Sequence, residues 1–162
     1  MGVAGSGKTT VGRALAPILG VPFIEGDDFH TASARERMAA GEPLTDGDRR
    51  PWIERLNGEL RRHAAVGCVL ACSALRRSYR RWLTDGLDGV VFVALIVPAA
   101  VLRARLAHRT DHFAHADLLM SQLATLELGG DVIPIDGDAA VAVVLREAMD
   151  AIETAEITDV VE

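Results

Sequence analysis

The sequence has 162 residues, of which 49% are hydrophobic, and this size and composition predict one compact α/β domain with a sizeable core. The net charge of −6 argues against a general nucleic-acid-binding surface, because such binding depends on neutralising many phosphates. No stretch approaches the roughly 18 consecutive apolar residues of a membrane span, and the N-terminus lacks a basic and then apolar signal, so we expect a cytoplasmic protein.

The first residues carry the most specific motif of the chain. Residues 2–9 fit the pattern G-x-x-x-x-G-K-[ST] at every fixed position, and a helix-compatible run follows to Leu19. In such a loop, glycines let backbone N–H groups converge on phosphate oxygens at the start of a helix. The lysine contacts the β- and γ-phosphates, and the last hydroxyl ligates Mg²⁺. The motif therefore predicts a nucleoside triphosphate site made of Gly2, Gly5, Ser6, Gly7, Lys8, Thr9 and Thr10, with Thr9 as a metal ligand.

A short strand over residues 21–24 is expected to lead into an acidic turn, residues 25–30. In α/β sheets, ligands collect at the carboxyl ends of the strands. The turn holds Asp27, Asp28 and His30. One of the two aspartates serves equally well as the N-cap of a helix expected over residues 31–40, which leaves the other free for chemistry.

The middle of the chain predicts a helix, a buried strand and a second helix. Asp48 suits the N-cap of a helix that starts near Pro51 and ends near Gly67. Residues 68–72 are a continuous apolar run typical of a strand buried on both faces. Its two cysteines, roughly 13 Å apart along the strand, are too distant for a disulfide. The helix expected over residues 74–83 carries four arginines, which fit RNA or, better in an acidic chain, a solvated face with one inward arginine that reaches an anionic substrate.

The last part of the chain predicts two further strands with a helical segment between them. Residues 90–97 form the most apolar strand, and Pro98 starts a helix to His108. A polar break precedes a helix over about residues 116–127, and we expect residues 109–127 to form a small lid. The last strand is expected over residues 131–136 and the closing helix over residues 139–152. The remaining residues are expected to form a frayed tail. Residues 1–162 are thus expected to form a single domain.

The strand that normally precedes a P-loop is missing, since only Met1 stands before Gly2. We expect its absence to leave the strands at residues 69–72 and 91–97 facing each other across about two strand spacings, roughly 9.5 Å. Because unpaired buried backbone groups cost about 1–3 kcal/mol each, we expect Met1 to be an internal methionine of a chain that starts about 6 to 10 residues upstream. A replacement strand from residues 157–161 is the alternative.

Several segments together resemble the gluconate kinase family. They are the P-loop, residues 26–30 (GDDFH), 38–46 (MAAGEPLTD), 48–52 (DRRPW), 72–80 (CSALRRSYR), 112–113 (HF) and 118–127 (LLMSQLATLE). Their order and spacing cover nearly the whole chain and are more specific than the P-loop alone. The resemblance implies ATP-dependent phosphorylation of D-gluconate to 6-phosphogluconate on a nucleoside-monophosphate-kinase-like fold, with a parallel sheet and helices on both faces. It also suggests a homodimer.

The resemblance further implies roles for residues on the side of the acceptor sugar. Asp27 is expected to orient or deprotonate the C6 hydroxyl of gluconate and to hold Mg²⁺ through water, with His30 as a partner for a sugar hydroxyl. Arg49 and Arg76 are expected to bind the gluconate carboxylate and the transferring phosphate, because a guanidinium fork matches planar anions.

Other residues are expected on the side of the nucleotide and the lid. Arg105 and Arg109 should reach the phosphates when the lid closes, Arg109 as a catalytic residue beside Lys8. His112 and Gln122 should contact the substrate and order the closed lid. The adenine is expected at the turn after the last strand, which holds Gly137 and Asp138.

Two other interpretations stay open on the sequence. A small-molecule kinase like shikimate kinase would share the P-loop, the acidic turn and an arginine for a carboxylate, and a nucleotide-binding module without catalysis would need the P-loop alone. The chain also departs from the usual pattern of the gluconate kinase family. The departures are Thr31, Ala34 and Arg37 after the acidic turn, and Asp111 where glycine is usual before the His-Phe pair of the lid.

Overall fold

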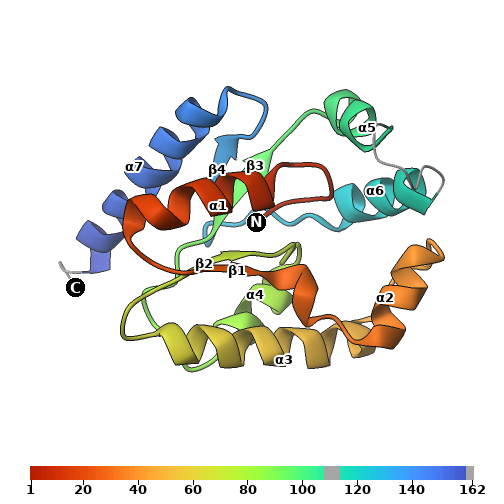
Figure 1. The fold of residues 1–162 in the computed structure, drawn as a ribbon, viewed down its shortest axis with the longest axis horizontal. Coiled ribbons are helices and arrows are strands. Elements are labelled where there is room, and N and C mark those ends of the chain that lie inside the picture. Colours follow the sequence, from red (N-terminus) through yellow and green to blue (C-terminus); the bar gives the residue numbers. More distant parts are fainter. Residues whose placement is uncertain (108–113, 160–162) are drawn as a thin grey trace.

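The computed structural model describes residues 1–107 and 114–159 of the chain. Helices alternate with short parallel strands along these residues (Figure 1). The elements are α1 (Lys8–Leu19), β1 (Phe23–Glu25), the 3₁₀ helix η1 (Gly26–Phe29), α2 (Ala32–Ala39), α3 (Asp46–His63), β2 (Val69–Ala71), α4 (Arg77–Leu83), β3 (Val93–Ile96), α5 (Ala99–Ala107), α6 (Ala114–Thr125), β4 (Ile133–Asp136) and α7 (Val141–Asp159).

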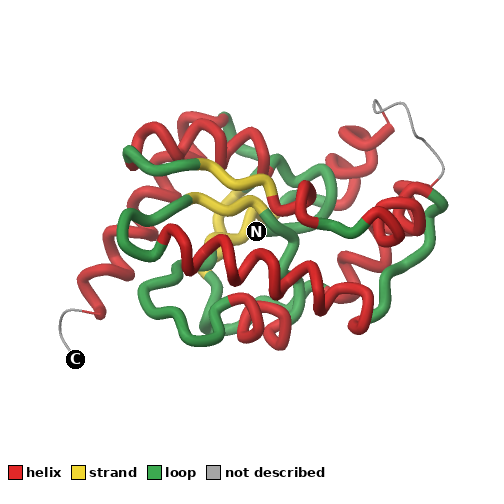
Figure 2. The backbone as a smooth tube through the Cα atoms, turned by 60° about the horizontal axis from the view of Figure 1, so that its bottom comes forward, coloured by secondary structure: helices red, strands yellow, loops and turns green. Residues whose placement is uncertain are grey.

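The described strands pair as two parallel couples. β1 pairs with β2, with Phe23 opposite Val69, and β3 pairs with β4. Met1 lies between the two couples, as Figure 1 and Figure 2 both show. Its amino group donates to the carbonyl of Val93, and its own carbonyl accepts from the N–H of Leu95 at 3.0 Å. β2 and β3 do not pair with each other among the described strands, as predicted, and the expected width of the gap stays a prediction.

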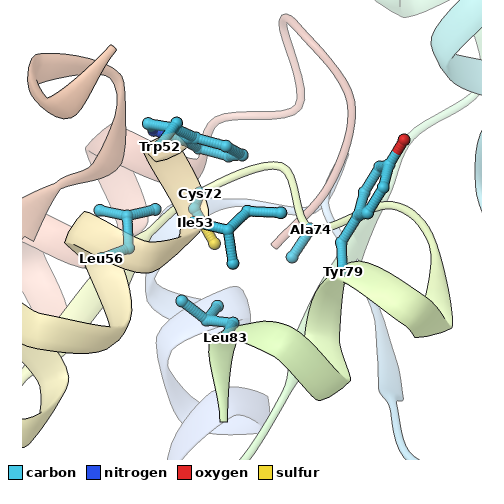
Figure 3. Packing of buried hydrophobic residues seen from close by; sticks show 7 residues of the cluster. All are labelled: Trp52, Ile53, Leu56, Cys72, Ala74, Tyr79 and Leu83. Carbon is cyan, nitrogen blue, oxygen red and sulfur yellow. The ribbon is translucent and has the colours of Figure 1, made fainter. Parts of the chain in front are cut away.

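Apolar side chains on the two faces of the strands pack against two separate layers of helices. Leu70 and Phe92 pack against the core of α3 and α4, whereas their chain neighbours Val69 and Val93 pack against the core of α1 and α7. This alternation has the period of two that a strand imposes. The predicted arrangement, a parallel sheet with helices on both faces, is therefore confirmed (Figure 1). Figure 3 shows the buried residues of the first core: Trp52, Ile53, Leu56, Cys72, Ala74, Tyr79 and Leu83.

The acidic turn does not cap the helix that follows it. Asp27 and Asp28 both lie within η1, and Thr31 is the N-cap of α2, where its hydroxyl oxygen accepts from the N–H of Ala34 at 3.0 Å. The expected aspartate cap was therefore wrong. A threonine at the position that departs from the family pattern provides the cap, and both aspartates stay available at the edge of the strands.

Helix α3 starts earlier than predicted because its capping signal was assigned to the wrong residue. Thr45 is the N-cap, and Asp48 is the third residue of the helix. The Thr45 side chain accepts from the N–H of Asp48, and the Asp48 carboxylate accepts from the N–H of Thr45, which is a capping box. Arg37 donates to the same carboxylate at 2.7 Å, so this departure from the family pattern ties α2 to α3.

Helix α4 begins at Arg77, three residues later than predicted. Ala74 has a φ of 43°, in the left-handed region, and the chain there cannot be helical. The prediction of one inward arginine on this helix is confirmed, since Arg80 is 1% exposed. The partner of Arg80 in the structure is the carboxylate of Asp131, with Nε 2.8 Å from Oδ2, and contact of an arginine with the substrate stays a prediction for Arg76.

The C-terminal helix is longer than predicted. α7 continues to Asp159, so residues 157–159 are helical and supply no replacement strand. Both cysteines are free, and burial raises the pKa of the Cys72 thiol to about 11. None of the helices in the described ranges has the length and apolar character needed to cross a membrane.

Candidate active site

The P-loop forms a cradle of backbone groups at the start of α1. Gly7 is the N-cap with a φ of 95°, and no side chain caps the helix there, so the first N–H groups of α1 are open to an anion. A Cβ on Gly2 would lie 2.8 Å from the hydroxyl of Ser6, so the loop requires glycine at this position. That hydroxyl is buried without a hydrogen-bond partner among the described residues. Lys8 donates to the carbonyl of Val3 at 3.0 Å, which holds its ammonium group at the loop.

Arg105 connects the P-loop to the predicted adenine turn. Its Nη2 lies 2.7 Å from Oδ1 of Asp138, and its Nη1 donates to the carbonyls of Gly5 and Gly137, each at 3.4 Å. The structure therefore brings together three segments that the sequence assigned to the nucleotide, although they are far apart along the chain. Thr9 and Thr10 are exposed on the first turn of α1 beside them.

Gln122 contacts the P-loop. Its side-chain oxygen accepts from the N–H of Ala4 at 2.6 Å, and Leu119 on the same helix shares a core with Val3. Helix α6 of the predicted lid thus rests on the nucleotide side of the site. The other two residues predicted for the lid, Arg109 and His112, lie outside the described residues.

The acidic turn is held at the carboxyl end of β1 by Trp52 from α3. The indole N–H donates to the carbonyl of Gly26 at 2.7 Å, and the ring stacks on His30 with centroids 4.4 Å apart. A Cβ on Gly26 would lie 2.6 Å from the carbonyl oxygen of Ala71, so the turn packs closely on β2. The Asp27 side chain is 74% exposed, with Oδ1 4.0 Å from Nε2 of His30. The turn therefore presents a solvated carboxylate beside a fixed imidazole.

His30 is a neutral imidazole at physiological pH. Burial, and after it the positive charges of Arg49 and Arg35, together lower its pKa to about 4. Its Nδ1 atom is buried and has no hydrogen-bond partner among the described residues. A neutral imidazole suits hydrogen bonding to a hydroxyl better than pairing with a carboxylate, in line with the predicted role for His30.

Arg49 and Arg76 converge on one tyrosine. Their guanidinium carbons lie 5.6 and 5.5 Å from the centroid of the Tyr79 ring, within the range of a cation–π interaction. Arg76 contacts both carboxylate oxygens of Asp46, at 3.1 and 3.2 Å, and the Tyr79 hydroxyl donates to the same group. Figure 3 shows the tyrosine hydroxyl pointing away from Leu83 and out of the core. Arg49 donates to the Tyr79 hydroxyl at 3.4 Å, so both arginines lie around this tyrosine near the N-terminal ends of α3 and α4.

Sequence reasoning did not assign Asp46 and Tyr79 to the site, although both lie in segments that carried the family resemblance. The available signal was spacing: Asp46 precedes Arg49 by three residues and Tyr79 follows Arg76 by three, so each pair shares one end of a helix. Burial and the hydrogen bond to Asp46 raise the pKa of Tyr79, so its hydroxyl stays a hydrogen-bond donor.

The two sides of the site meet around Cys72. A Cβ on Gly26 of the acidic turn would lie 2.9 Å from the Cβ of Cys72, and Leu75, three residues after Cys72, shares a core with Val3 of the P-loop. A phosphate cradle, an exposed carboxylate and a pair of arginines therefore share the carboxyl ends of the strands. Such an arrangement serves phosphoryl transfer from a nucleotide to a small acid.

Comparison with known proteins agrees with that geometry. Residues 1–128 match the family model described as an AAA domain. A gluconokinase of Gluconobacter oxydans (strain 621H) is 47% identical over 152 residues, which cover 91% of this chain and 85% of the relative. The crystal structure of a gluconokinase from Sinorhizobium meliloti 1021 is similar, with a TM-score of 0.85 and 41% identity over 98% of this chain and 92% of that one. The fold and site thus define a P-loop kinase.

A shikimate kinase from Acinetobacter baumannii shares the fold alone, with a TM-score of 0.51 and 18% identity over 94% of this chain and 90% of its own. The chain belongs to the gluconokinase family.

Proposed function

We propose that this chain transfers the γ-phosphoryl group of ATP to the C6 hydroxyl of D-gluconate and so produces 6-phospho-D-gluconate and ADP. The observation that carries the proposal is the pair of arginines around Tyr79, which supplies cations for a carboxylate close to a P-loop. A neutral sugar would not need them. The gluconokinase relatives supply the identity of the acid.

In the proposed reaction the protein contributes position and charge. Asp27 accepts the proton of the C6 hydroxyl as the bond between this oxygen and the γ-phosphorus forms and the bond to the bridging oxygen of ADP breaks. Lys8 and the N–H groups of the first turn of α1 neutralise the phosphates, and His30 holds a sugar hydroxyl. Arg49 and Arg76 bind the carboxylate at the other end of gluconate and thereby fix its C6 hydroxyl.

The residues present fit a magnesium ion bound together with ATP. Mg²⁺ keeps several waters and takes one or two protein oxygens beside the substrate phosphates, so it needs no dense cluster of protein ligands. Among the described residues there is no group of three or more His, Cys, Asp or Glu that could hold a metal. Thr9, on the exposed first turn of α1, and the exposed carboxylate of Asp27 would supply the oxygens. The bound ion would stabilise the charge that develops on the phosphates.

Residues 109–127 are proposed as a lid on a single domain, with Arg109 and His112 reaching the phosphates and the sugar. The contact of Gln122 with the P-loop supports a lid that is anchored through α6. A cytoplasmic location and a homodimer complete the proposal, without nucleic-acid or membrane partners. Sedimentation velocity of the purified chain measures the oligomeric state.

The experiment that tests the proposed function is ATP turnover with a panel of acceptors. Purified enzyme is supplied with ATP, Mg²⁺ and either D-gluconate, shikimate or D-glucose. We expect turnover with gluconate alone, and 6-phosphogluconate as the product in mass spectrometry. Turnover with shikimate would assign the site to another kinase class. If the protein binds ATP but transfers phosphate to none of the three acceptors, it would be a nucleotide-binding module without catalysis.

A further inference from the structure

The buried arginine of α4 takes part in a cluster that joins the loop after β2 to the segment after α6. Arg80 donates through Nε and Nη2 to the two oxygens of Asp131, at 2.8 and 3.3 Å. Its Nη1 donates to the carbonyls of Ala74 and Leu75, at 3.0 and 3.2 Å. The guanidinium group thus binds a carboxylate and two carbonyls on opposite sides, and its hydrogen bonds lower the pKa of Asp131.

A second contact between the same two segments runs through Glu127. Its backbone N–H donates to the carbonyl of Leu75 at 2.9 Å, and its carboxylate accepts from the N–H of Arg77 at 2.7 Å. The N-cap residue of α4 is Arg76, whose side chain makes no capping hydrogen bond. The Glu127 carboxylate therefore caps the start of this helix instead. Residues 74–77 are held from one side by Arg80 and from the other by Glu127.

The loop held in this way is in a backbone conformation that its sequence disfavours. Ala74 has a φ of 43°, and it is the only residue other than glycine with positive φ among the described residues. A left-handed alanine persists only where surrounding contacts impose it. Ala74 is 2% exposed, and the hydrogen bond to its carbonyl comes from Arg80. The residue that this bend presents to the acceptor side is Arg76.

We propose that Arg80, held by Asp131, is a positioning residue for gluconate: it imposes the left-handed bend at Ala74 and so directs Arg76 toward the carboxylate of the substrate. The inference rests on the proposed function, because gluconate is the acid that Arg76 is assigned to bind. A buried ion pair is weak evidence of a stabilising role, since desolvation offsets much of its attraction. The geometry instead supports a role for the Arg80–Asp131 pair in fixing one conformation of the loop of residues 74–77.

The test compares Arg80→Lys with Arg81→Lys, a matched change at the exposed neighbouring position. Lysine keeps the charge but not the fork that reaches a carboxylate and two carbonyls together. For Arg80→Lys we expect the KM for gluconate to rise about tenfold while the KM for ATP stays within about twofold. Arg81→Lys should change neither. Should Arg80→Lys fail to fold, Asp131→Asn gives the same comparison while leaving Arg80 in place.

A rescue variant separates positioning from a merely structural role. Glycine accepts the left-handed conformation without a penalty, so adding Ala74→Gly to Arg80→Lys should recover at least about threefold of the lost gluconate affinity, whereas Ala74→Gly alone should change it less than about twofold. Strictly additive effects, or equal changes in both KM values, would overturn the proposal.

Hydrogen exchange at the amides of Arg77 and Glu127 reports the cluster without any substrate. We expect faster exchange at both amides in Arg80→Lys and unchanged exchange in Arg81→Lys. If wild-type enzyme shows no gluconate-dependent turnover, the proposed function fails, and the exchange data still decide whether Arg80 holds the loop. Unchanged exchange in Arg80→Lys would contradict the proposal whatever the acceptor is.

Discussion

The P-loop side of the site offers backbone groups from one short segment, whereas the acceptor side gathers side chains from η1, α3 and α4. On the P-loop side, Gly7 and the first turn of α1 present N–H groups, and Arg105 joins the loop to the turn of Asp138. On the acceptor side, Trp52 holds the acidic turn, and Tyr79 gathers Arg49 and Arg76. Phosphate needs a local arrangement that a single motif encodes, while recognition of a sugar acid depends on how distant elements pack.

This difference predicts which substrate each change affects. The first and largest effect is expected on the P-loop side. Lys8→Ala should lower kcat/KM by at least about a thousandfold, because it removes a charge that neutralises the transferring phosphate. The melting temperature should change little, since Lys8 is half-buried at the first position of α1 and is not part of the hydrophobic core. Steady-state kinetics and a thermal melt measure both quantities.

Arg13→Ala is the control for Lys8→Ala, because Arg13 is an exposed basic residue on the same helix, α1. Its guanidinium group lies over the ring of Phe23, 5.5 Å from the centroid, and it belongs to neither side of the site. It should retain near-normal turnover. Near-normal turnover in Lys8→Ala itself would mean that the P-loop does not serve phosphoryl transfer.

The second prediction concerns the boundary between the two sides. Asp27→Asn should lower kcat by about a hundredfold or more while ATP binding stays largely intact, in line with the usual contribution of a general base. Asp28→Asn changes the adjacent carboxylate of η1 and should have a much smaller effect. An effect of Asp27→Asn on the KM for gluconate alone would reassign this residue from catalysis to binding.

The third prediction is confined to the acceptor side. Arg49→Lys keeps the charge but loses the planar fork, so the KM for gluconate should rise about tenfold with the KM for ATP unchanged. Arg50→Lys is the matched control, because Arg50 is exposed and pairs with Glu54 at 2.8 Å outside the site. An unaltered KM for gluconate in Arg49→Lys would remove this arginine from the acceptor side.

The last prediction concerns the pH dependence of stability and not the kinetics. The pKa of His30 is about 4 in the folded chain and 6.5 in the unfolded chain, so the unfolded state binds more protons between these values. Stability should therefore fall as the pH drops from about 6.5 to 4, by up to about 3 kcal/mol. The difference between wild type and His30→Gln in urea melts at several pH values isolates this contribution. Equal pH dependence in the two chains would show that His30 is not held in a desolvating site.

The two sides also differ in how far the sequence predicted them. The P-loop follows from its motif alone, and the alternation of apolar runs with helical segments was enough for the parallel fold. The roles of the acceptor residues came from the family resemblance. Asp46 and Tyr79 were not assigned, because their importance depends on the packing of α3 against α4, which brings together residues 33 positions apart in the chain.

Long-range pairs explain the remaining differences between sequence and structure. The partner of Arg80 is Asp131, 51 residues away, and no local pattern indicates it. The start of α4 depends on the conformation of Ala74, a residue whose own preference is helical. The error at the start of α3 did not come from a long-range pair. Thr45 and Asp48 have the spacing of a capping box, but the N-cap was assigned to Asp48 and not to Thr45.

The central claim is that arginines on the acceptor side select gluconate by its carboxylate, and a matched pair of acceptors tests it most directly. D-Glucitol carries the same hydroxyl groups as D-gluconate but a CH₂OH group in place of the carboxylate. The measurement is kcat/KM for both acceptors in wild type, Arg49→Lys and Arg76→Lys. We predict a wild-type preference for gluconate of at least about a hundredfold, reduced in both variants by slower reaction of gluconate while glucitol is unaffected. Equal use of the two acceptors by wild type, or an undiminished preference in both variants, would contradict the account.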